Sequence, residues 1–443
     1  MVEELRQGIH QVAERLGQEL RCSLAFPGRD WVFFPLESRG VQYFGVLSTE
    51  EPPFEGKLVT LSFQGRKLFV FPFTLDNALR LRDVIPELTP TTLCKEVSWG
   101  VVEESPVLLS LVFGALWEKG VFPLSGTCAA EGKREELEKA LRSSLWGAFA
   151  GGGRGRFGVF SQERAWQFFK EASSLGYTAY ILESEEHIRK EAFTWEEAQL
   201  KEAFFRLSSR EKEAWKRYCD RSFRFSRDFV LSFPEERCLR MLFAYFPLLD
   251  ILEEGFAFLE SQDIPFDLGV SFEKLPPEAH FFLAEELHRR GVDFHVLFPG
   301  ASEGDSDLPF HTLLARTIGG YRLGFSCRDP KSLPPFPEEP RGMLHLFSAH
   351  LGFPVLLEVI ALEDPDLFRR LLEEALEASG VSFALETVPD RELPGILEKS
   401  SLRNAVQNAT PLLFAHHRET LEAYLFAFES EIAQKIRERL CLQ

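Results

Sequence analysis

The stretch Phe266-Asp-Leu-Gly-Val-Ser-Phe272 opens the part of the sequence that decides the fold. It is a short apolar run with an alternating pattern, which is typical of a strand. Leu275-Pro-Pro-Glu278 follows and indicates a helix start, because proline is tolerated in the first helical turn. Apolar residues then recur at helical spacing as far as Arg290-Gly291. The stretch therefore predicts a strand followed directly by a helix.

The same alternation continues to Leu376. Further strands are predicted over residues 293–298, 321–325, 344–348 and 355–360, and further helices over 311–318 and 364–376. Strand, short loop, helix and short loop in repetition is the pattern of parallel β/α units. We therefore predict an α/β fold with a TIM-barrel-like (β/α)8 domain, which has seven to nine strands within residues 155–385. A doubly wound open sheet is the alternative.

The N-terminal part of the chain has a different pattern. An amphipathic helix is predicted over residues 2–20, and five short strand-like runs follow between 23 and 73, separated by turns rich in proline and glycine. We predict two domains. Residues 1–90 form an N-terminal helix plus a small β-rich domain, and residues 91–443 form the barrel-like domain with helices at its C-terminal end.

Composition limits the kinds of partner. The chain has 443 residues and a formal net charge of −18, which opposes binding to nucleic-acid phosphates and to anionic membranes. Its longest apolar runs are too short to span a bilayer, and Met1-Val-Glu-Glu-Leu5 does not resemble a signal peptide. The seven cysteines are scattered and form no C-x-x-C pair, which favours a reducing compartment. We predict a cytoplasmic protein that binds neither nucleic acid nor membrane and that can form homo- or hetero-oligomers.

Phenylalanine is unusually abundant, with 43 residues against 7 tyrosines. Phenylalanine lacks the hydroxyl for which a buried tyrosine must find a partner. One interpretation is a core packed with phenylalanine and nothing more. The other is that apolar residues have replaced polar residues of a functional site.

The glycine-rich run Gly151–Gly158 contains the G-x-G spacing found in phosphate-binding loops. A dinucleotide-binding loop requires a strand before the glycines and a helix opening within them. Here a helix is predicted before the run and a strand after it, so a simple connection is favoured.

The histidines do not form a helical metal-binding motif such as H-E-x-x-H. His416 and His417 are expected to lie exposed at a helix start. His345, in the predicted strand 344–348, is the best single candidate for a functional histidine, with a structural role as the alternative.

Asp329-Pro-Lys331 follows the predicted strand 321–325 and would lie at the carboxyl end of the barrel. Lys331 there could hold a carboxylate or a carbonyl oxygen. The alternative is a tight turn with proline at its second position.

Several blocks of the sequence resemble the tagaturonate/fructuronate epimerases, and together they extend over roughly residues 90–440. The blocks occur in the family order and are Pro277-Glu-Ala-His-Phe-Phe-Leu-Ala-Glu-Glu-Leu287, Gly319-Gly-Tyr-Arg-Leu323, Gly342-Met-Leu-His345 and Asp364-Pro-Asp-Leu-Phe-Arg369. The resemblance implies a TIM-barrel-like fold and a metal-assisted epimerisation of a keto-uronate. In that reaction a divalent metal polarises the carbonyl while a protein base moves a proton or promotes C–C cleavage and re-addition.

The chain departs from the family pattern at its site motifs. The family's Asp-Glu pair aligns with Gly269 and Val270, and a family lysine aligns with Phe347. The loop Ser326-Cys-Arg-Asp-Pro-Lys331 keeps the lysine but loses a histidine, and Val159-Phe-Ser-Gln-Glu-Arg-Ala165 replaces a cluster of Asp, His and Lys. The resemblance therefore implies a divalent metal whose ligands are replaced in this chain, so we assign no metal ligand and no cofactor.

Three hypotheses remain open. The chain is an active sugar-acid epimerase with a rearranged site, a non-catalytic barrel that binds a sugar acid, or a structural partner of an active paralogue. For the active enzyme we assign Lys331 and His345 as catalytic residues, and in the non-catalytic barrel Arg328 and Lys331 hold the carboxylate of the sugar acid. The residues assigned to substrate binding are Arg328, Asp329, His350 and His280.

Overall fold

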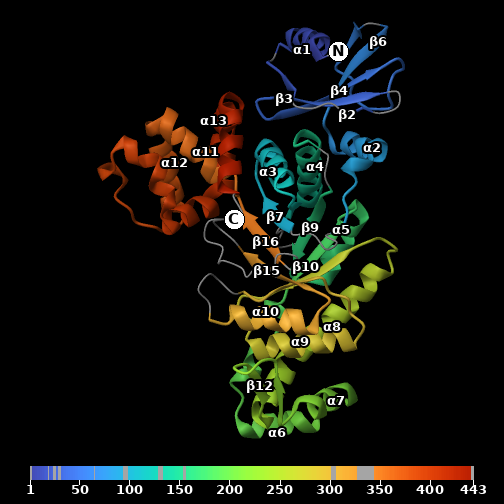
Figure 1. Ribbon diagram of the computed structural model, residues 1–443, viewed down its shortest axis with the longest axis vertical. Helices are drawn as coiled ribbons and strands as arrows, with labels where there is room; N and C mark the ends of the chain where they lie inside the picture. The colour runs from blue at the N-terminus through green and yellow to red at the C-terminus, as the bar shows by residue number, and fades with distance from the viewer. Residues whose placement is uncertain are drawn as a thin grey trace.

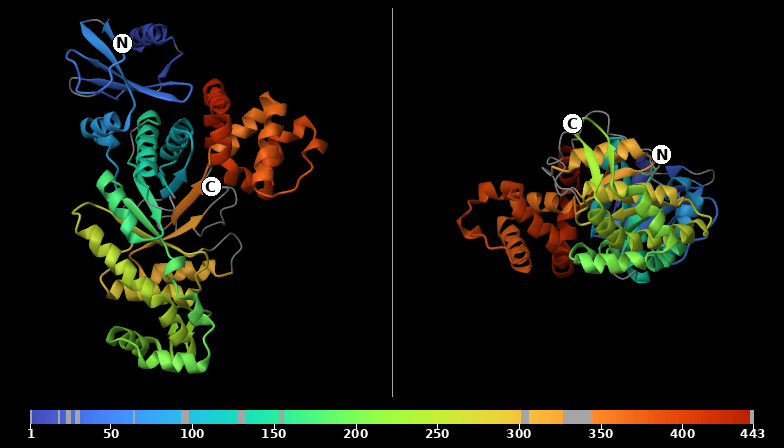
Figure 2. Two further views of the ribbon diagram at one scale, coloured as in Figure 1. Left: turned by 180° about the vertical axis from the view of Figure 1, so that it is seen from behind. Right: turned by 90° about the horizontal axis from the view of Figure 1, so that it is seen from below.

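The computed structural model describes residues 2–17, 19–22, 26–27, 31–63, 65–92, 98–127, 133–152, 156–300, 306–326 and 344–440. An antiparallel sheet lies at one end of the elongated molecule and a helical insertion lies at the other (Figure 1). Parallel strands and their helices lie between these ends, and the C-terminal helices project to one side (Figure 2).

The central part is a closed barrel of parallel strands. The strands are β7 (Ser98–Val102), β8 (Phe122–Thr127), β9 (Gly158–Glu163), β10 (Ala179–Glu183), β13 (Asp267–Ser271), β14 (Val296–Phe298), β15 (Arg322–Ser326) and β16 (Leu344–Ala349). Each strand pairs in parallel with the next one in this series, and β16 pairs with β7 to close the barrel. Because all strands run the same way, their carboxyl ends share one rim.

Helices follow seven of these strands in the sequence. They are α3 (Pro106–Glu118), α4 (Arg134–Ala150), α5 (Phe169–Leu175), α8 (Glu235–Glu260), α9 (Pro277–Arg289), α10 (Leu308–Ile318) and α11 (Phe353–Glu363). Residues 327–343, between β15 and β16, lie outside the described residues. The predicted α/β class is confirmed, and the described residues show the predicted alternation for seven strands.

The strand prediction differs from the structure in three respects. Residues 355–360 lie in helix α11, which is buried on nearly all sides, and such a helix has the same continuous apolar sequence as a buried strand. The barrel strands β7 and β8 precede the window of 155–385 in which strands were predicted. Residues 227–233 also have a strand-like pattern, but their last part is β12 (Val230–Phe233), which pairs antiparallel with β11 (Arg221–Arg224) outside the barrel.

An insertion between β10 and β13 carries β11, β12 and the helices α6 (Glu197–Phe205) and α7 (Ser209–Tyr218). Residues 183–221 are rich in alternating charge, a pattern typical of solvated helices, and α6 and α7 lie within them. A buried carboxylate attaches the insertion to the barrel: Glu286 of α9 accepts hydrogen bonds from Arg217 at 2.8 Å and from the Tyr218 hydroxyl at 2.8 Å. Glu286 is 3% exposed, and removal of either donor would leave a poorly compensated buried charge.

The N-terminal sheet contains six strands. They are β1 (Arg21–Cys22), β2 (Phe26–Pro27), β3 (Val32–Ser38), β4 (Val41–Ser48), β5 (Val59–Phe63) and β6 (Arg66–Pro72), and their main order is β1-β3-β4-β6-β5. Helix α1 (Val2–Leu16) covers one face, where Ile9 and Val12 pack with Phe34 and Leu36. The predicted N-terminal helix and β-rich region are therefore present.

The other face of the sheet packs on helix α4 through aromatic rings. Phe73, which follows β6, lies 5.0 Å from Trp146 and 6.1 Å from Phe149 between ring centroids. Phe44 lies 6.4 Å from Phe73 and extends the cluster into the sheet. Sheet and barrel thus share one continuous core. The predicted domain boundary near residue 90 stays a prediction.

The C-terminal helices α12 (Pro365–Ala378) and α13 (Ser400–Arg439) pack with α11 beside the barrel. Asp364 caps α12 by accepting a hydrogen bond of 2.9 Å from the Leu367 backbone N–H. Helix α13 bends at His417 and Phe428, whose backbone angles are not helical. No described helix combines the length and the apolar character needed to cross a bilayer.

We expect Phe73→Ala to reduce the free energy of unfolding by about 3–5 kcal/mol, because it leaves a cavity between sheet and α4. Urea unfolding followed by tryptophan fluorescence would measure the change. Phe205→Ala is the control: its side chain is 81% exposed, so its effect should stay within about 0.5 kcal/mol. Equal effects of both substitutions would contradict the aromatic junction.

Candidate functional site

The interior of the barrel is packed with apolar side chains. Phe122, Leu124, Phe160, Ile181, Val296 and Phe298 form one buried cluster there. The ring of Phe298 occupies the space beside Gly324, where an added Cβ would lie 2.3 Å from the ring. A filled interior leaves the rim at the carboxyl ends of the strands as the place for chemistry.

Polar side chains gather on this rim where β9 and β10 end. Gln162 Nε2 donates a 2.9 Å hydrogen bond to Glu183 Oε1, and Arg164 Nε lies 3.5 Å from Glu183 Oε2. Arg164 also donates to Glu186 at 3.2 Å, and the His187 ring contacts the Arg164 carbonyl oxygen. We call Gln162, Arg164, Glu183, Glu186 and His187 the strand-end cluster.

The strand-end cluster combines groups that recognise a polar ligand. A guanidinium can bind a carboxylate through two parallel hydrogen bonds, and Arg164 remains 49% exposed beside Glu183. Glu183 is 36% exposed, so its carboxylate can accept hydrogen bonds from ligand hydroxyls or accept a proton. The arrangement can therefore bind a polyhydroxylated acid.

A second polar pair lies where β7 and β16 end. Glu103 follows β7, and its Oε1 accepts a hydrogen bond of 2.5 Å from the Gly352 N–H at the start of α11. Burial raises the pKa of Glu103 to about 8. The Glu103 side chain is therefore largely a neutral acid at pH 7, and its Oε2 has no partner among the described residues.

His350 follows β16 directly. Its backbone N–H donates to Val102 O at 2.7 Å, and its φ of 53° lies in the left-handed region, which is uncommon for histidine. Burial lowers the pKa of His350 to about 4, so the ring is neutral at pH 7. Its Nδ1 has no hydrogen-bond partner among the described residues. His350 thus lies at the rim, where the sequence predicted a substrate-binding residue.

His280 is placed elsewhere. It lies in α9, with Nδ1 2.8 Å from His311 Nδ1 and Nε2 2.6 Å from the Tyr321 hydroxyl. Both ring nitrogens therefore face protein groups within the helical layer, and burial lowers the pKa of His280. This geometry gives no support to the predicted contact between His280 and substrate.

The other predicted site residues cannot be placed by their side chains. His345 lies in β16, where its backbone is in register with Gly324 of β15 and Ser98 of β7. Its side chain is not among the described ones. Arg328, Asp329 and Lys331 lie outside the described residues. The roles assigned to these four residues remain predictions.

Two motifs from the sequence have structural roles. Gly151 ends helix α4, and the C-terminal end of a helix carries partial negative charge, which opposes phosphate binding. His416 and His417 lie at a kink of α13 where two helical segments meet, and His416 is exposed, as expected. Their rings contact the two carboxylate oxygens of Glu374 at 2.5 and 2.7 Å.

The described donors do not fit a divalent metal. They contain no group of three or more His, Cys, Asp or Glu side chains arranged to hold an ion. Gly269, where the resemblance implies a carboxylate in the family, lies in β13, and a Cβ added there would lie 3.3 Å from Ile181. Glu183 is already paired with Arg164, which would compete with a cation. No step of the chemistry below is assigned to a metal.

The sequence did not predict the strand-end cluster. In the sequence, residues 159–165 are distinguished only by their departure from the family pattern. The sequence does not show directly which strands pair. Glu183 lies 21 residues after Gln162, and the two side chains meet only because β9 pairs with β10. Polar residues at the ends of two consecutive predicted strands are the pattern that could have found it.

Glu103→Gln tests the buried acid. An unfolded glutamate has a pKa of about 4.3, whereas the folded pKa is about 8. Between these values the folded protein keeps a proton that the unfolded chain releases, so stability falls as pH rises from about 4.5 to about 8. Glutamine mimics the neutral acid. We expect the free energy of unfolding of the variant, relative to that of the wild type, to increase over this range, by a few kcal/mol near pH 8.

Urea unfolding at pH 4.5, 6, 7 and 8 measures the difference. Titration of His350 occurs in both proteins and cancels in the comparison. Glu202→Gln, at an exposed position in α6, is the control and should show a constant difference across the range. A constant difference for Glu103→Gln as well would contradict the neutral buried acid.

Comparison with known proteins identifies the family of this chain. A family model described as "UxaE: tagaturonate epimerase" matches residues 29–384. The tagaturonate/fructuronate epimerase of Thermotoga maritima is 24% identical over 384 residues, which cover 77% of this chain and 78% of that protein. A glycerol-complexed crystal structure of the fructuronate-tagaturonate epimerase UxaE from Cohnella laeviribosi has a TM-score of 0.82 at 18% identity and covers 98% of both chains. Its native structure has a TM-score of 0.81 at 17% identity and covers 97% of both chains. The chain therefore belongs to the UxaE tagaturonate epimerase family.

Proposed function

We propose that this protein binds a hexuronate-type sugar acid at the carboxyl rim of its barrel, which we assign to the (β/α)8 type. We propose further that epimerisation of a keto-uronate is altered or lost. The observation that carries the proposal is the strand-end cluster. It holds one carboxylate between an amide and a guanidinium, above an interior closed by apolar rings.

A sugar acid matches the groups on this rim. Its carboxylate suits Arg164, and Arg328 and Lys331 are the further proposed cations. Its hydroxyls suit Gln162 and Glu183, which offer an amide and a carboxylate. His350 and Asp329 are the further proposed substrate contacts, and Lys331 and His345 are the proposed catalytic residues.

The expected loss of activity follows from what epimerisation next to a carbonyl requires. Such a reaction needs a base for the proton and a positive or donor group for the charge that develops on oxygen. The two carboxylate oxygens of Glu183 are already engaged, Oε1 by Gln162 and Oε2 by Arg164, so neither is free to act as the base. Glu103 is an acid held neutral by burial, and its oxygen bonds the backbone of α11.

A thermal-shift screen tests the proposal with D-glucuronate, D-galacturonate and the keto-uronates tagaturonate and fructuronate. Each is measured alone and with Mn²⁺, Co²⁺, Ni²⁺ or Zn²⁺, and turnover of the keto-uronates is followed in parallel. We expect stabilisation by a sugar acid that does not depend on metal. Metal-dependent stabilisation together with turnover would instead identify a working epimerase. No stabilisation by any of them would favour a structural partner of an active paralogue.

Arg164→Ala should weaken sugar-acid binding by about tenfold or more, because a hydrogen bond to a charged group contributes about 1.5–3 kcal/mol. Arg210→Ala is the matched control. Arg210 also pairs with a carboxylate, Glu253, and is 58% exposed, but it lies in the insertion. Its loss should leave the Kd unchanged in isothermal titration calorimetry. Lys331→Ala and His345→Ala measured alongside test the remaining rim, and unchanged Kd values in all three rim variants would exclude the rim as the site.

A further inference from the structure

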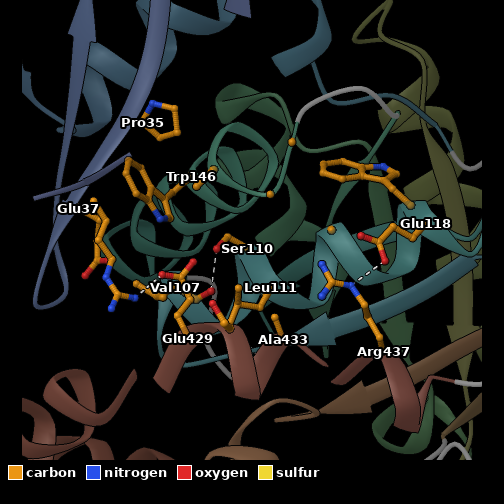
Figure 3. A pocket seen from close by; sticks show the side chains of 17 residues that line it. Pro35, Glu37, Val107, Ser110, Leu111, Glu118, Trp146, Glu429, Ala433 and Arg437 are labelled. Carbon is orange, nitrogen blue, oxygen red and sulfur yellow. Dashed lines mark hydrogen bonds and ion pairs between the residues drawn. The ribbon is translucent and has the colours of Figure 1, made fainter. Parts of the chain in front are cut away.

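A cavity of about 700 Å³ lies where three parts of the chain meet. Its walls come from the N-terminal sheet, from helices α3 and α4, and from helix α13 (Figure 3). None of the lining residues belongs to a barrel strand, so this cavity is separate from the rim. Pockets that hold small molecules have volumes of roughly 300–1,000 Å³. The size alone therefore permits a ligand.

Trp146 supplies the observation that points to one. Its side chain is 1% exposed, and its Nε1 has no hydrogen-bond partner among the described residues. Phe73 and Phe149 hold the ring with centroid distances of 5.0 and 6.2 Å. Figure 3 shows the indole nitrogen on the side of the ring that is nearer to Val107 and Glu429. A buried N–H without an acceptor is unfavourable, and an acceptor in the cavity would relieve this.

Two ion pairs provide further donors and acceptors. Arg21 lies 2.6 Å from Glu429 at one side of the cavity, and Arg437 lies 2.7 Å from Glu118 at another. Each pair is electrically balanced. A guanidinium has five N–H donors and a carboxylate has about four acceptor positions, so both groups can still bind a ligand.

The charge of the lining opposes an anion. Two arginines, Arg21 and Arg437, face three glutamates, Glu37, Glu118 and Glu429, so the lining has no excess of positive charge. The C-terminal end of α4 at Gly151 adds partial negative charge. The lining therefore favours a neutral ligand over a sugar acid.

We propose that this cavity is an accessory site for a neutral polyhydroxylated molecule, namely a sugar or polyol of pentose or hexose size. Each hydroxyl of such a molecule can both accept from the Trp146 N–H and donate to a carboxylate. Its C–H faces suit the apolar side chains of Leu111, Trp117 and Ala433. The bound molecule would contact the N-terminal sheet and α13 together.

The test uses two ligands that differ at one carbon. D-Glucose carries a CH₂OH group where D-glucuronate carries a carboxylate. D-Xylose and D-mannitol extend the neutral set. Isothermal titration calorimetry of the full chain should show binding of at least one neutral ligand. Trp146→Phe should weaken that binding by roughly threefold to tenfold, because it removes one donor.

Trp215→Phe is the matched control. Trp215 Nε1 also lacks a partner among the described residues, but Trp215 lies in α7 at the far end of the molecule. Its replacement should leave binding of the neutral ligand unchanged. Ala433→Leu fills the cavity from α13 without removing a polar contact, and it should abolish binding. Circular dichroism and the urea midpoint check that each variant is folded.

Three outcomes would overturn the proposal. These are no binding by any neutral ligand, neutral binding that survives both Ala433→Leu and Trp146→Phe, and D-glucuronate binding that Ala433→Leu abolishes. Binding of D-glucuronate that resists Ala433→Leu concerns the rim instead. The accessory site and the proposed function can thus fail independently.

Discussion

The pairing of β16 with β7 is the constraint on which the rest of the structure depends. It joins His345 to Ser98, residues separated by most of the barrel sequence, and it converts a curved sheet into a closed one. Closure leaves the barrel without an edge strand and brings the ends of β7 and β16 together. The contacts of His350 with Val102 and of Glu103 with Gly352 exist only because these two ends meet. Closure of the parallel barrel therefore creates one of the two polar features of the rim.

The interior and the rim have different chemistry. Apolar side chains fill the interior as far as Phe298, so a ligand at the rim would lie above an apolar surface that excludes water. Among the described residues of the rim, two polar groups stand out, one at the ends of β9 and β10 and one at the ends of β7 and β16. Gly269 in β13 has no side chain and therefore contributes no polar group to the rim. A sugar acid has an apolar ring face and polar edges, and this division of the surface suits it.

Much of the fold could be predicted from the sequence because the relevant signals are local. Helix starts such as Pro277 and Asp364 follow from turn chemistry, and the short strands β3 to β6 follow from the turns rich in proline and glycine that separate them. Residues 355–360 could not be assigned correctly, because complete burial removes the polar face that distinguishes a helix from a buried strand. The strand-end cluster has a weak signal in the polar residues at the ends of two consecutive strands, whereas the cavity beside Trp146 has none. They depend on which segments meet in space, which no local pattern contains.

The aromatic junction between the N-terminal sheet and α4 has a consequence for synthesis on the ribosome. The sheet is complete by Pro72, but Trp146 and Phe149 emerge much later. During that interval the growing chain presents a phenylalanine-rich face to water, with no partner yet made. The barrel itself cannot close until β16 has been translated. A nascent chain of this protein is therefore a natural client for chaperones that shield aromatic surface, and slow translation before α4 would prolong its exposure to aggregation.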